Sequence, residues 1–455
     1  MGIASMTAWR LNPQTRLRRA SGGGAAFLPE TATTVELDEE AFAALALLST
    51  ARTARDMRRR LIGRFNRNFT IAEIEILLRE LGRQRFVVEA QNAPADSINR
   101  QPPVNYAQSL PTAPESVHLQ VNNVCNLRCP SCYVGLREDD DGSLPLERIL
   151  SLIDEWAEMG VFQLALGGGE PLMSPKFAPV VRYARKRGIV PNVTTNGRLI
   201  TEELLDETAG GLGELRMSLN DAVSVNKALI EEKAALLRAR DTRFGFNLIV
   251  TRQNLDRLSE LLRWALAQGA ATINLIRPKP APGNERWYQH NALTPADSAR
   301  LASTLPRLEP HFSKTNLTVD CAFSFLFHGW PAEELWARGV AGCAMGERFA
   351  TVKWNGDVYP CSHLHGAEFN AGNVKHKSFC EIWQSGPVFS RVRREIGQVS
   401  GACGACGHKA FCKGCRAVMQ RQTGDWLAAD DECGAAPASL LTINLQRPIT
   451  VELKS

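Results

Sequence analysis

The chain has 455 residues and a formal net charge of +5, with 44% apolar and 22% charged residues. This composition is typical of a folded globular protein of several domains, and it excludes collagen-like, low-complexity and disordered chains. No run of 18 apolar residues predicts a membrane span, no secretory signal opens the chain, and the mild charge gives no indication of nucleic acid, so we expect a cytoplasmic protein.

The first 90 residues contain 14 arginines but no lysine and no cysteine. Their apolar runs predict three strands, at residues 16–19, 25–28 and 33–37. The residues that follow predict three helices, which begin at Asp38, near Met57 and at Thr70. This order indicates a small winged-helix-like domain over residues 1–90, and the polar, proline-bearing residues 91–115 indicate a linker.

From residue 116 onward, apolar runs alternate with amphipathic segments. Strands are expected at residues 117–121, 162–166, 190–194, 215–219, 244–250 and 272–276. Helices are expected between them, at residues 146–159, 176–186, 202–208, 226–238 and 255–268. Repeated βα units predict an α/β domain with a parallel sheet, barrel-like or doubly wound, over residues 116–310. Functional loops should then follow the C-terminal ends of the strands.

Twelve cysteines make the second half of the chain unusual. Thiols stay reduced in the cytosol, so short and clustered cysteine spacings indicate metal or iron–sulfur ligands rather than disulfides. Residues 311–435 hold most of the cysteines and only short apolar runs, so this region is expected to need metal in order to fold. We expect residues 436–455 to form a C-terminal tail.

The segment Cys125-Asn-Leu-Arg-Cys129-Pro-Ser-Cys132 directly follows the first strand expected after residue 116. Three thiolates on one loop can hold three irons of a [4Fe–4S] cube and leave the fourth iron open to a small molecule. A zinc knuckle is the alternative, but no Cys or His within 20 residues after Cys132 completes a tetrahedral site. The next strand leads into Gly167-Gly168-Gly169-Glu170-Pro171, where glycines allow a backbone to approach a ligand closely.

These two motifs together resemble those of the radical S-adenosylmethionine (SAM) superfamily. The resemblance covers residues 116–310 and implies a partial (β/α)6 barrel. It also implies that the open iron binds the amino and carboxylate groups of SAM, and that one electron cleaves SAM to methionine and a 5′-deoxyadenosyl radical.

The resemblance further implies which residues contact SAM. Backbone groups of Gly168, Gly169 and Glu170 would bind the methionine amine, within the turn that Pro171 completes. At the ends of the next two strands, Asn196, Ser218 and Asn220 match family positions. Two departures are visible: Ser131 replaces the usual aromatic residue before the third cysteine, with Tyr133 after it, and the usual arginine past the serine is missing. Lys227 or Arg277 is then the candidate partner of the SAM carboxylate, although a lysine or arginine at such a position is more often a solvated surface charge.

Seven late cysteines resemble the SPASM domain, the auxiliary-cluster module of peptide- and protein-modifying radical enzymes. The resemblance implies that Cys343, Cys361 and Cys415 hold a first auxiliary cluster. A second cluster would be held by Cys403, Cys406, Cys412 and Cys433. The closing C-x2-C is a variant that resembles thioether-forming peptide maturases, and a pair of zinc sites is the alternative.

Only three cysteines are assigned to the first auxiliary cluster, so its fourth ligand is missing. Either Cys321 supplies the fourth ligand from a strand-like run at 317–327, or the site is open to a substrate thiolate. Cys380 is expected to be a buried free thiol. His363 and His365 form the only close histidine pair near these ligands, and we expect them to have ordinary surface or turn roles.

The N-terminal region resembles the peptide-recognition element of ribosomal-peptide enzymes. Such elements capture a leader peptide as an added strand, here on the strand at 33–37 with the helix at 71–81 as the groove wall. The three consecutive arginines at 58–60 could instead bind DNA, but they point around a helix rather than forming one stripe.

We therefore predict a radical SAM enzyme with three [4Fe–4S] clusters that modifies a ribosomally made precursor peptide, forming a thioether or carbon–carbon crosslink, with flavodoxin or ferredoxin as electron donor. Alternative enzymes are a sulfatase-type maturase that oxidises a protein residue and a cofactor-biosynthesis enzyme. An alternative of another class is an iron–sulfur redox-sensing regulator that binds peptide or DNA.

Overall fold

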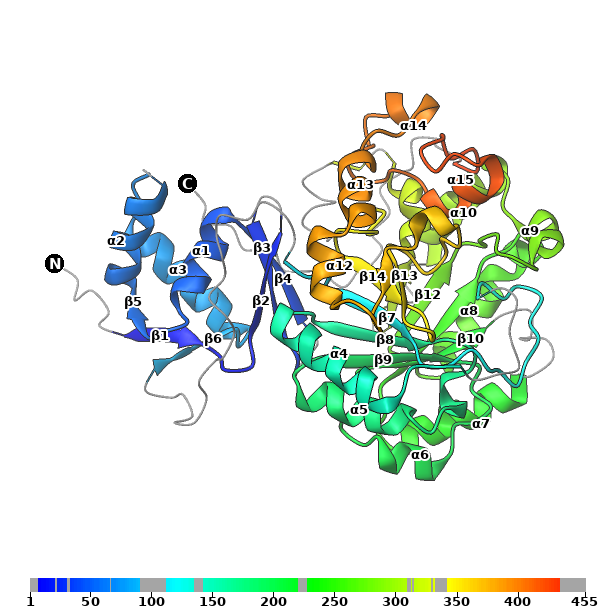
Figure 1. The fold of residues 1–455 in the computed structure, drawn as a ribbon, viewed down its shortest axis with the longest axis horizontal. Helices are drawn as coiled ribbons and strands as arrows, with labels where there is room; N and C mark the ends of the chain where they lie inside the picture. Colours follow the sequence, from blue (N-terminus) through cyan, green and yellow to red (C-terminus); the bar gives the residue numbers. More distant parts are fainter. Residues whose placement is uncertain are drawn as a thin grey trace. The chain divides into compact units, whose positions relative to one another are not determined.

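The computed structural model describes residues 7–20, 23–30, 33–65, 67–90, 112–134, 142–219, 227–308, 312, 315–328, 330–331 and 342–433. These residues divide into two compact units, one mainly from the chain before residue 116 and one mainly from the chain after it (Figure 1).

The N-terminal unit contains two antiparallel sheets of three strands each. One sheet has the order β5 (Arg52–Thr53), β1 (Ala8–Leu11) and β6 (Val87–Glu89). The other has the order β2 (Arg16–Ala20), β3 (Gly23–Leu28) and β4 (Thr33–Asp38), so that β4 is an edge strand. The sequence predicted the second sheet but not the first, because strands as short as β1 and β5 show no clear alternation. The winged-helix-like fold is therefore not confirmed.

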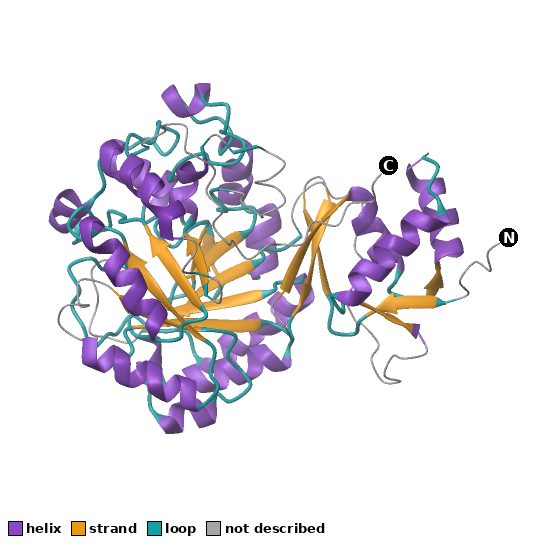
Figure 2. Ribbon diagram, turned by 180° about the vertical axis from the view of Figure 1, so that it is seen from behind, coloured by secondary structure: helices purple, strands orange, loops and turns teal. Residues whose placement is uncertain are grey.

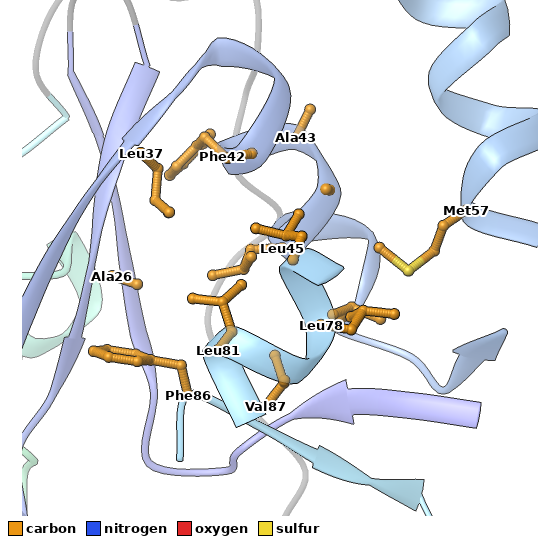
Figure 3. Close-up of a cluster of buried hydrophobic side chains, with 14 of the residues drawn as sticks. Ala26, Leu37, Phe42, Ala43, Leu45, Met57, Leu78, Leu81, Phe86 and Val87 are labelled. Atoms are coloured by element: carbon orange, nitrogen blue, oxygen red, sulfur yellow. The ribbon is translucent and has the colours of Figure 1, made fainter. Parts of the chain in front are cut away.

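Three helices complete this unit: α1 (Glu39–Leu47), α2 (Ala54–Phe65) and α3 (Ile71–Arg83). The side chain of Asp38 accepts a hydrogen bond from Ala41 N and caps α1, while Thr70 and Glu73 form the predicted capping box of α3. Their apolar faces meet those of the sheets in one buried core, part of which Figure 3 shows. The unit therefore has a hydrophobic core of its own.

The second unit is built on a ten-stranded sheet with the order β13-β12-β11-β10-β9-β8-β7-β14-β15-β16. Its parallel strands are β7 (Ser116–Gln120), β8 (Gln163–Gly167), β9 (Val190–Thr195), β10 (Leu215–Leu219), β11 (Phe244–Ile249), β12 (Thr272–Ile276) and β13 (Asn316–Val319). The connecting helices are α4 (Leu146–Met159), α5 (Phe177–Lys186), α6 (Glu202–Glu207), α7 (Lys227–Ala239) and α8 (Leu258–Ala267), which cover the outer face of the strands (Figures 1 and 2). The βα pattern predicted from the sequence is confirmed.

Two features of this sheet differ from the prediction. The alternation of strands and helices does not stop at residue 310, because α9 (Glu285–Asn291) and α10 (Pro295–Leu308) lead into β13. In addition, β14 (Phe349–Val352) pairs in parallel with β7 and continues into the antiparallel strands β15 (Asp357–Tyr359) and β16 (Gly372–Asn373). The cysteine-rich region thus shares one sheet with the parallel strands β7 to β13.

Short helices form most of what remains of the cysteine-rich region. They are the 3-10 helix η6 (Cys321–Phe327) and the helices α12 (Phe379–Ser385), α13 (Pro387–Glu395), α14 (Gly401–Ala405) and α15 (Arg416–Thr423). Because Cys321 begins η6, the expected strand-like run at 317–327 is wrong beyond the end of β13. Within the described residues, no helix is both long and apolar enough to cross a membrane.

Candidate active site and iron–sulfur sites

The loop at residues 121–133 carries the C-x3-C-x2-C motif and is called here the cluster loop. It follows β7 directly and lies against the glycine-rich turn that follows β8. Gly169 N donates to Asn122 O at 3.1 Å, and Glu170 N donates to Val124 O at 2.8 Å. The two motifs that are separated by 35 residues in sequence are therefore joined by backbone hydrogen bonds.

The glycines of this turn are required by that contact. A Cβ on Gly169 would lie 1.9 Å from Val124 O, and a Cβ on Gly168 would lie 2.3 Å from Asn122 O. Gly168 also has a φ of +129°, which side-chain-bearing residues rarely adopt. We expected the glycines to admit a ligand, and the structure shows that they also admit the cluster loop itself.

Glu170 connects the glycine-rich turn to the next strand end through its side chain. The residue is 1% exposed, and its carboxylate accepts hydrogen bonds from Thr195 Oγ1 at 2.7 Å, Asn196 N at 2.8 Å and Leu172 N at 3.1 Å. Burial raises the pKa of this carboxyl group, and these hydrogen bonds oppose that rise. Asn196 in turn donates from Nδ2 to Asn126 Oδ1 of the cluster loop at 2.7 Å. Asn196 therefore lies beside the cluster loop.

Buried polar atoms without a protein partner surround the cluster loop. Among the described residues they include Gln120 Oε1, both polar side-chain atoms of Asn123 and Ser131 Oγ. An unpaired buried polar atom is costly, so such a group is typical of a site that receives a polar ligand. SAM offers amino, carboxylate and hydroxyl groups of the kind these atoms require.

The remaining residues assigned to SAM lie in different surroundings. Ser218 is half-buried near the end of β10, and Asn220 lies outside the described residues. Lys227 begins α7, where its Nζ lies 5.6 Å from the ring centroid of Trp264. The buried Arg277 does not resemble a solvated surface charge, because its guanidinium pairs with both oxygens of Asp430, at 2.7 and 2.8 Å. Arg277 therefore has its partner within the protein and is no longer a candidate for the SAM carboxylate.

The four cysteines assigned to the second auxiliary cluster line one pocket. Cys403, Cys406, Cys412 and Cys433 share it with the rings of Phe325, Phe327 and Phe411. Burial, together with the proximity of Cys433, Asp430 and Cys403, raises the pKa of Cys412 to about 12. Four sulfur donors that converge in an apolar pocket fit a [4Fe–4S] cluster.

The three cysteines assigned to the first auxiliary cluster belong to one hydrophobic cluster, in which Cys343 and Cys415 are buried and Cys361 is partly buried. Cys321 is exposed as a residue, but the protein around its thiol raises the pKa, as does the proximity of Cys343, Asp320 and Cys415. This influence indicates that the Cys321 thiol lies near the thiols of Cys343 and Cys415. Among the described residues, no three His, Cys, Asp or Glu side chains are close enough to hold a single metal ion.

A cluster of histidines beside the radical site was missed by the sequence analysis. His118 on β7 is buried, and its Nε2 lies 3.4 Å from Tyr133 Oη at the end of the cluster loop. The ring of His363 lies 4.7 Å from that of Tyr133, and His365 has one ring nitrogen buried without a partner among the described residues. Burial lowers the pKa of His118 and of His365 to about 4. His363 lies in a turn, as expected, but both histidines are partly buried, and the ring of His363 packs against Tyr133.

The expectation for Cys380 also needs correction, since this residue lies on α12 and is partly exposed rather than buried.

The sequence contained one signal for His118. His118 and Gln120 alternate with the apolar Val117 and Leu119 along β7, which marks two polar side chains on the same face of a buried strand.

Comparisons with known proteins agree with this geometry. The model of the radical SAM superfamily matches residues 119–231, and that of the SPASM iron-sulfur cluster-binding domain matches residues 343–415. Over 315 residues, the chain is 30% identical to the mycofactocin maturase MftC of Mycobacterium ulcerans, which covers 66% of this chain and 82% of that protein. This chain belongs to the radical SAM family with a SPASM domain.

Two further relatives and one solved structure broaden this picture of the radical SAM enzyme. This chain is 29% identical to PqqA peptide cyclase of Xanthomonas campestris over 71% of this chain and 88% of that protein. It is 28% identical to the AdoMet-dependent heme synthase of Methanosarcina barkeri over 71% of this chain and 97% of that protein. SuiB of Streptococcus suis, solved with its precursor peptide SuiA, shares the fold, with a TM-score of 0.71 and 17% identity over 93% of this chain and 99% of SuiB. The protein is a radical SAM enzyme of the peptide-modifying type, and its cofactors are SAM and [4Fe–4S] clusters.

Proposed function

We propose that this enzyme binds the leader of a ribosomally made precursor peptide and forms a thioether or carbon–carbon crosslink in its core. The observation that carries the proposal is that the cluster loop and the glycine-rich turn follow β7 and β8 of the same sheet to which β14 and β15, the strands between Cys343 and Cys361, also belong. Such a sheet brings a radical-generating site and electron-accepting sites to the same substrate.

The cluster loop and the turn after β8 would form the SAM site. Cys125, Cys129 and Cys132 would hold a [4Fe–4S] cluster, which supplies the electron that cleaves SAM to a 5′-deoxyadenosyl radical. Backbone groups from Gly168 to Glu170 would orient the methionine part of SAM, and Asn196 and Ser218 would contact its polar groups. Glu170 keeps this turn in register with β9 through its buried carboxylate.

We propose two further clusters, which give three in all. The pocket of Cys403, Cys406, Cys412 and Cys433 supplies four ligands for one of them. Cys343, Cys361 and Cys415 supply three ligands for the other, and Cys321 supplies the fourth, because its thiol is close enough to interact electrostatically with Cys343 and Cys415. This assignment leaves Cys380 as the one cysteine without a cluster.

The N-terminal unit would bind the leader. Within the described residues, β4 pairs only with β3, so its other edge can receive an added strand. Ile76 on α3 is 67% exposed, which is unusual for a large apolar side chain and suits a peptide-docking surface. Because SuiB shares the fold over 93% of this chain, the likeness must include most of this unit.

Two further expectations belong to the proposal. A small one-electron carrier such as flavodoxin or ferredoxin would reduce the cluster of the cluster loop. A reducing compartment such as the cytoplasm keeps the cysteine ligands available as thiols.

Removal of the leader-binding unit tests the proposal. An enzyme that lacks residues 1–90 should fail to modify the full precursor, while its cleavage of SAM without peptide turnover continues. A milder test is Ile76→Glu, which should weaken leader binding at least about tenfold, or 1.4 kcal/mol, in a fluorescence-anisotropy titration.

The matched control for Ile76→Glu is Gly63→Glu on α2. It adds the same charge to the same unit at a position where a Cβ meets nothing within 4 Å. The recognition role is wrong if the truncated enzyme processes the precursor normally, or if both point variants weaken binding equally.

The heme synthase relative favours cofactor maturation as a second candidate function. A binding assay separates the two. A peptide maturase should bind the precursor through its N-terminal unit, and Ile76→Glu should weaken that binding. A heme-forming enzyme should instead bind a porphyrin and leave the precursor unbound.

A further inference from the structure

Lys279 is a buried cation that the reaction outlined above does not use. It lies three residues beyond β12 and is 8% exposed. Its Nζ forms an ion pair with the carboxylate of Asp320 and donates to Arg277 O at 3.3 Å. A buried lysine is rare and costly unless it is paired, so this position calls for a functional explanation.

The partner of Lys279 also positions a candidate cluster ligand. Asp320 immediately precedes Cys321, and its Oδ1 accepts a hydrogen bond from Ala322 N at 2.9 Å, which caps η6. The same carboxylate therefore holds the lysine ammonium group and fixes the start of the helix that carries the Cys321 thiol.

A second connection runs from the same strand end to another candidate ligand. Arg277, whose carbonyl accepts from Lys279, holds Asp430 through its guanidinium, and Asp430 Oδ2 accepts a hydrogen bond from Cys415 N at 2.8 Å. Lys279 is thus fixed between the backbone that precedes Cys321 and the network that holds Cys415.

The charge of Lys279 reaches most of the first auxiliary site. Its ammonium group contacts the side chain of Asp320, the residue before Cys321, and interacts electrostatically with Cys321, Cys361 and Cys415. A fixed positive charge at this place stabilises any additional negative charge on the group that these thiolates hold.

We infer that Lys279 is a positioning residue that raises the reduction potential of the cluster at Cys321, Cys343, Cys361 and Cys415, and so makes this cluster the electron acceptor of the crosslinking reaction. The inference rests on the proposed function. Abstraction of a hydrogen atom leaves a carbon radical in the peptide. When this radical bonds to a second peptide group, that group would lose its proton to solvent, and one electron would have to leave. A cluster held by these four cysteines would accept that electron, and the Lys279 ammonium group would stabilise the added negative charge.

A redox titration of the reconstituted holoenzyme, followed by electron paramagnetic resonance, tests the inference without reference to activity. Lys279→Met removes the charge but keeps a long side chain, and it should lower the potential of one auxiliary cluster by about 59 mV or more, which is a tenfold change in a one-electron equilibrium. Asp320→Asn keeps the helix cap and removes the opposing charge, so it should shift the same potential upward.

Two control variants accompany this pair. Lys279→Arg keeps the charge and should keep the potential near its original value. Lys377→Met removes an exposed lysine, paired with Glu381 on the surface, and should change no potential. The two variants Lys279→Met and Asp320→Asn must shift the reduction potential of one and the same cluster in opposite directions.

The outcomes separate the inference from the proposed function. An unchanged potential in Lys279→Met overturns the inference. If this variant fails to assemble its cluster, Asp320→Asn decides, and an unchanged or lowered potential in it also overturns the inference. By contrast, a wild-type enzyme that binds about eight irons rather than about twelve has no third cluster, and then the proposed function itself fails.

Discussion

The two cysteine-bearing regions of the second unit hold their thiols by different means. In the cluster loop, the three cysteines are partly exposed, and backbone hydrogen bonds to the turn after β8 fix the loop. In the auxiliary region, Cys343 and Cys415 are themselves part of a hydrophobic core. The first arrangement is supported by the parallel sheet, whereas in the second two of the candidate metal ligands are also core residues.

This difference has a consequence for stability. A cluster that is bound by core residues contributes its binding free energy to folding, and a cluster on a preformed loop contributes little. We therefore expect loss of the loop cluster to abolish chemistry and leave the fold intact, and loss of an auxiliary cluster to damage the fold as well.

The largest effect is expected from removing ligands in each region. The triple variant of Cys125, Cys129 and Cys132 to Ala should lose all SAM cleavage, keep about eight irons and unfold near the wild-type temperature. Cys415→Ser should lose one auxiliary cluster and destabilise the protein by about 3 kcal/mol or more. Iron analysis and thermal unfolding measure both variants, and equal destabilisation of the two would contradict the comparison.

The next effect concerns the backbone contact that shapes the cluster loop. In Gly169→Ala, the new Cβ would lie 1.9 Å from Val124 O, so that the loop must move away from the turn. We expect SAM cleavage to fall about 100-fold or more, since small displacements of a reacting group have effects of this size. Gly397→Ala, which meets nothing within 4 Å, is the control and should be silent. A fully active Gly169→Ala enzyme would show that the contact is dispensable.

A smaller effect is expected from Glu170→Gln. The buried carboxylate accepts hydrogen bonds from three donors, and an amide can accept only through its single oxygen. One donor should be left without its partner, at a cost of about 1–3 kcal/mol in the free energy of unfolding. Denaturant unfolding measures this cost, and we expect the KM for SAM to rise more than kcat falls. An unchanged stability would exclude Glu170 as the connection between the two turns.

The smallest effect is a pH dependence that arises where the two regions meet. Burial lowers the pKa of His118 to about 4, below the value of 6.5 for an unburied histidine. Between these two pH values, the imidazole is protonated in the unfolded chain and neutral in the folded protein. This contribution to stability is complete above pH 6.5 and declines as the pH falls toward 4. Between pH 7 and pH 5 the wild type should lose about 2 kcal/mol more than His118→Gln, by urea unfolding at each pH. Parallel losses in both proteins would assign the acid sensitivity to other groups.

The parallel sheet and its helices could be predicted from the sequence because their signals are local. Each parallel strand is an apolar run flanked by an amphipathic helix, and the cysteine and glycine motifs stand at fixed places between them. The boundaries of β10, β12 and α4 were predicted to the residue. The assignment of auxiliary ligands came from resemblance and stays a prediction, and the four cysteines assigned to the second site line one pocket.

What could not be predicted depends on contacts between distant residues. The pairing of β14 with β7 joins residues more than 200 positions apart, and no local pattern announces it. The position of Arg277 opposite Asp430 and that of His118 beside Tyr133 depend in the same way on how loops meet at the strand ends. A charged residue at a strand end looks the same in sequence whether it binds a cofactor or a carboxylate of the protein.

Mass spectrometry of a precursor peptide encoded beside this gene tests the central claim most directly. The peptide is incubated anaerobically with the holoenzyme, SAM and a reductant, and 5′-deoxyadenosine is measured in parallel. The account predicts a product that has lost two hydrogens, formed together with one 5′-deoxyadenosine per crosslink, and no product from the triple variant of Cys125, Cys129 and Cys132. The account is contradicted if the triple variant modifies the peptide, or if the wild type cleaves SAM while every candidate peptide keeps its original mass.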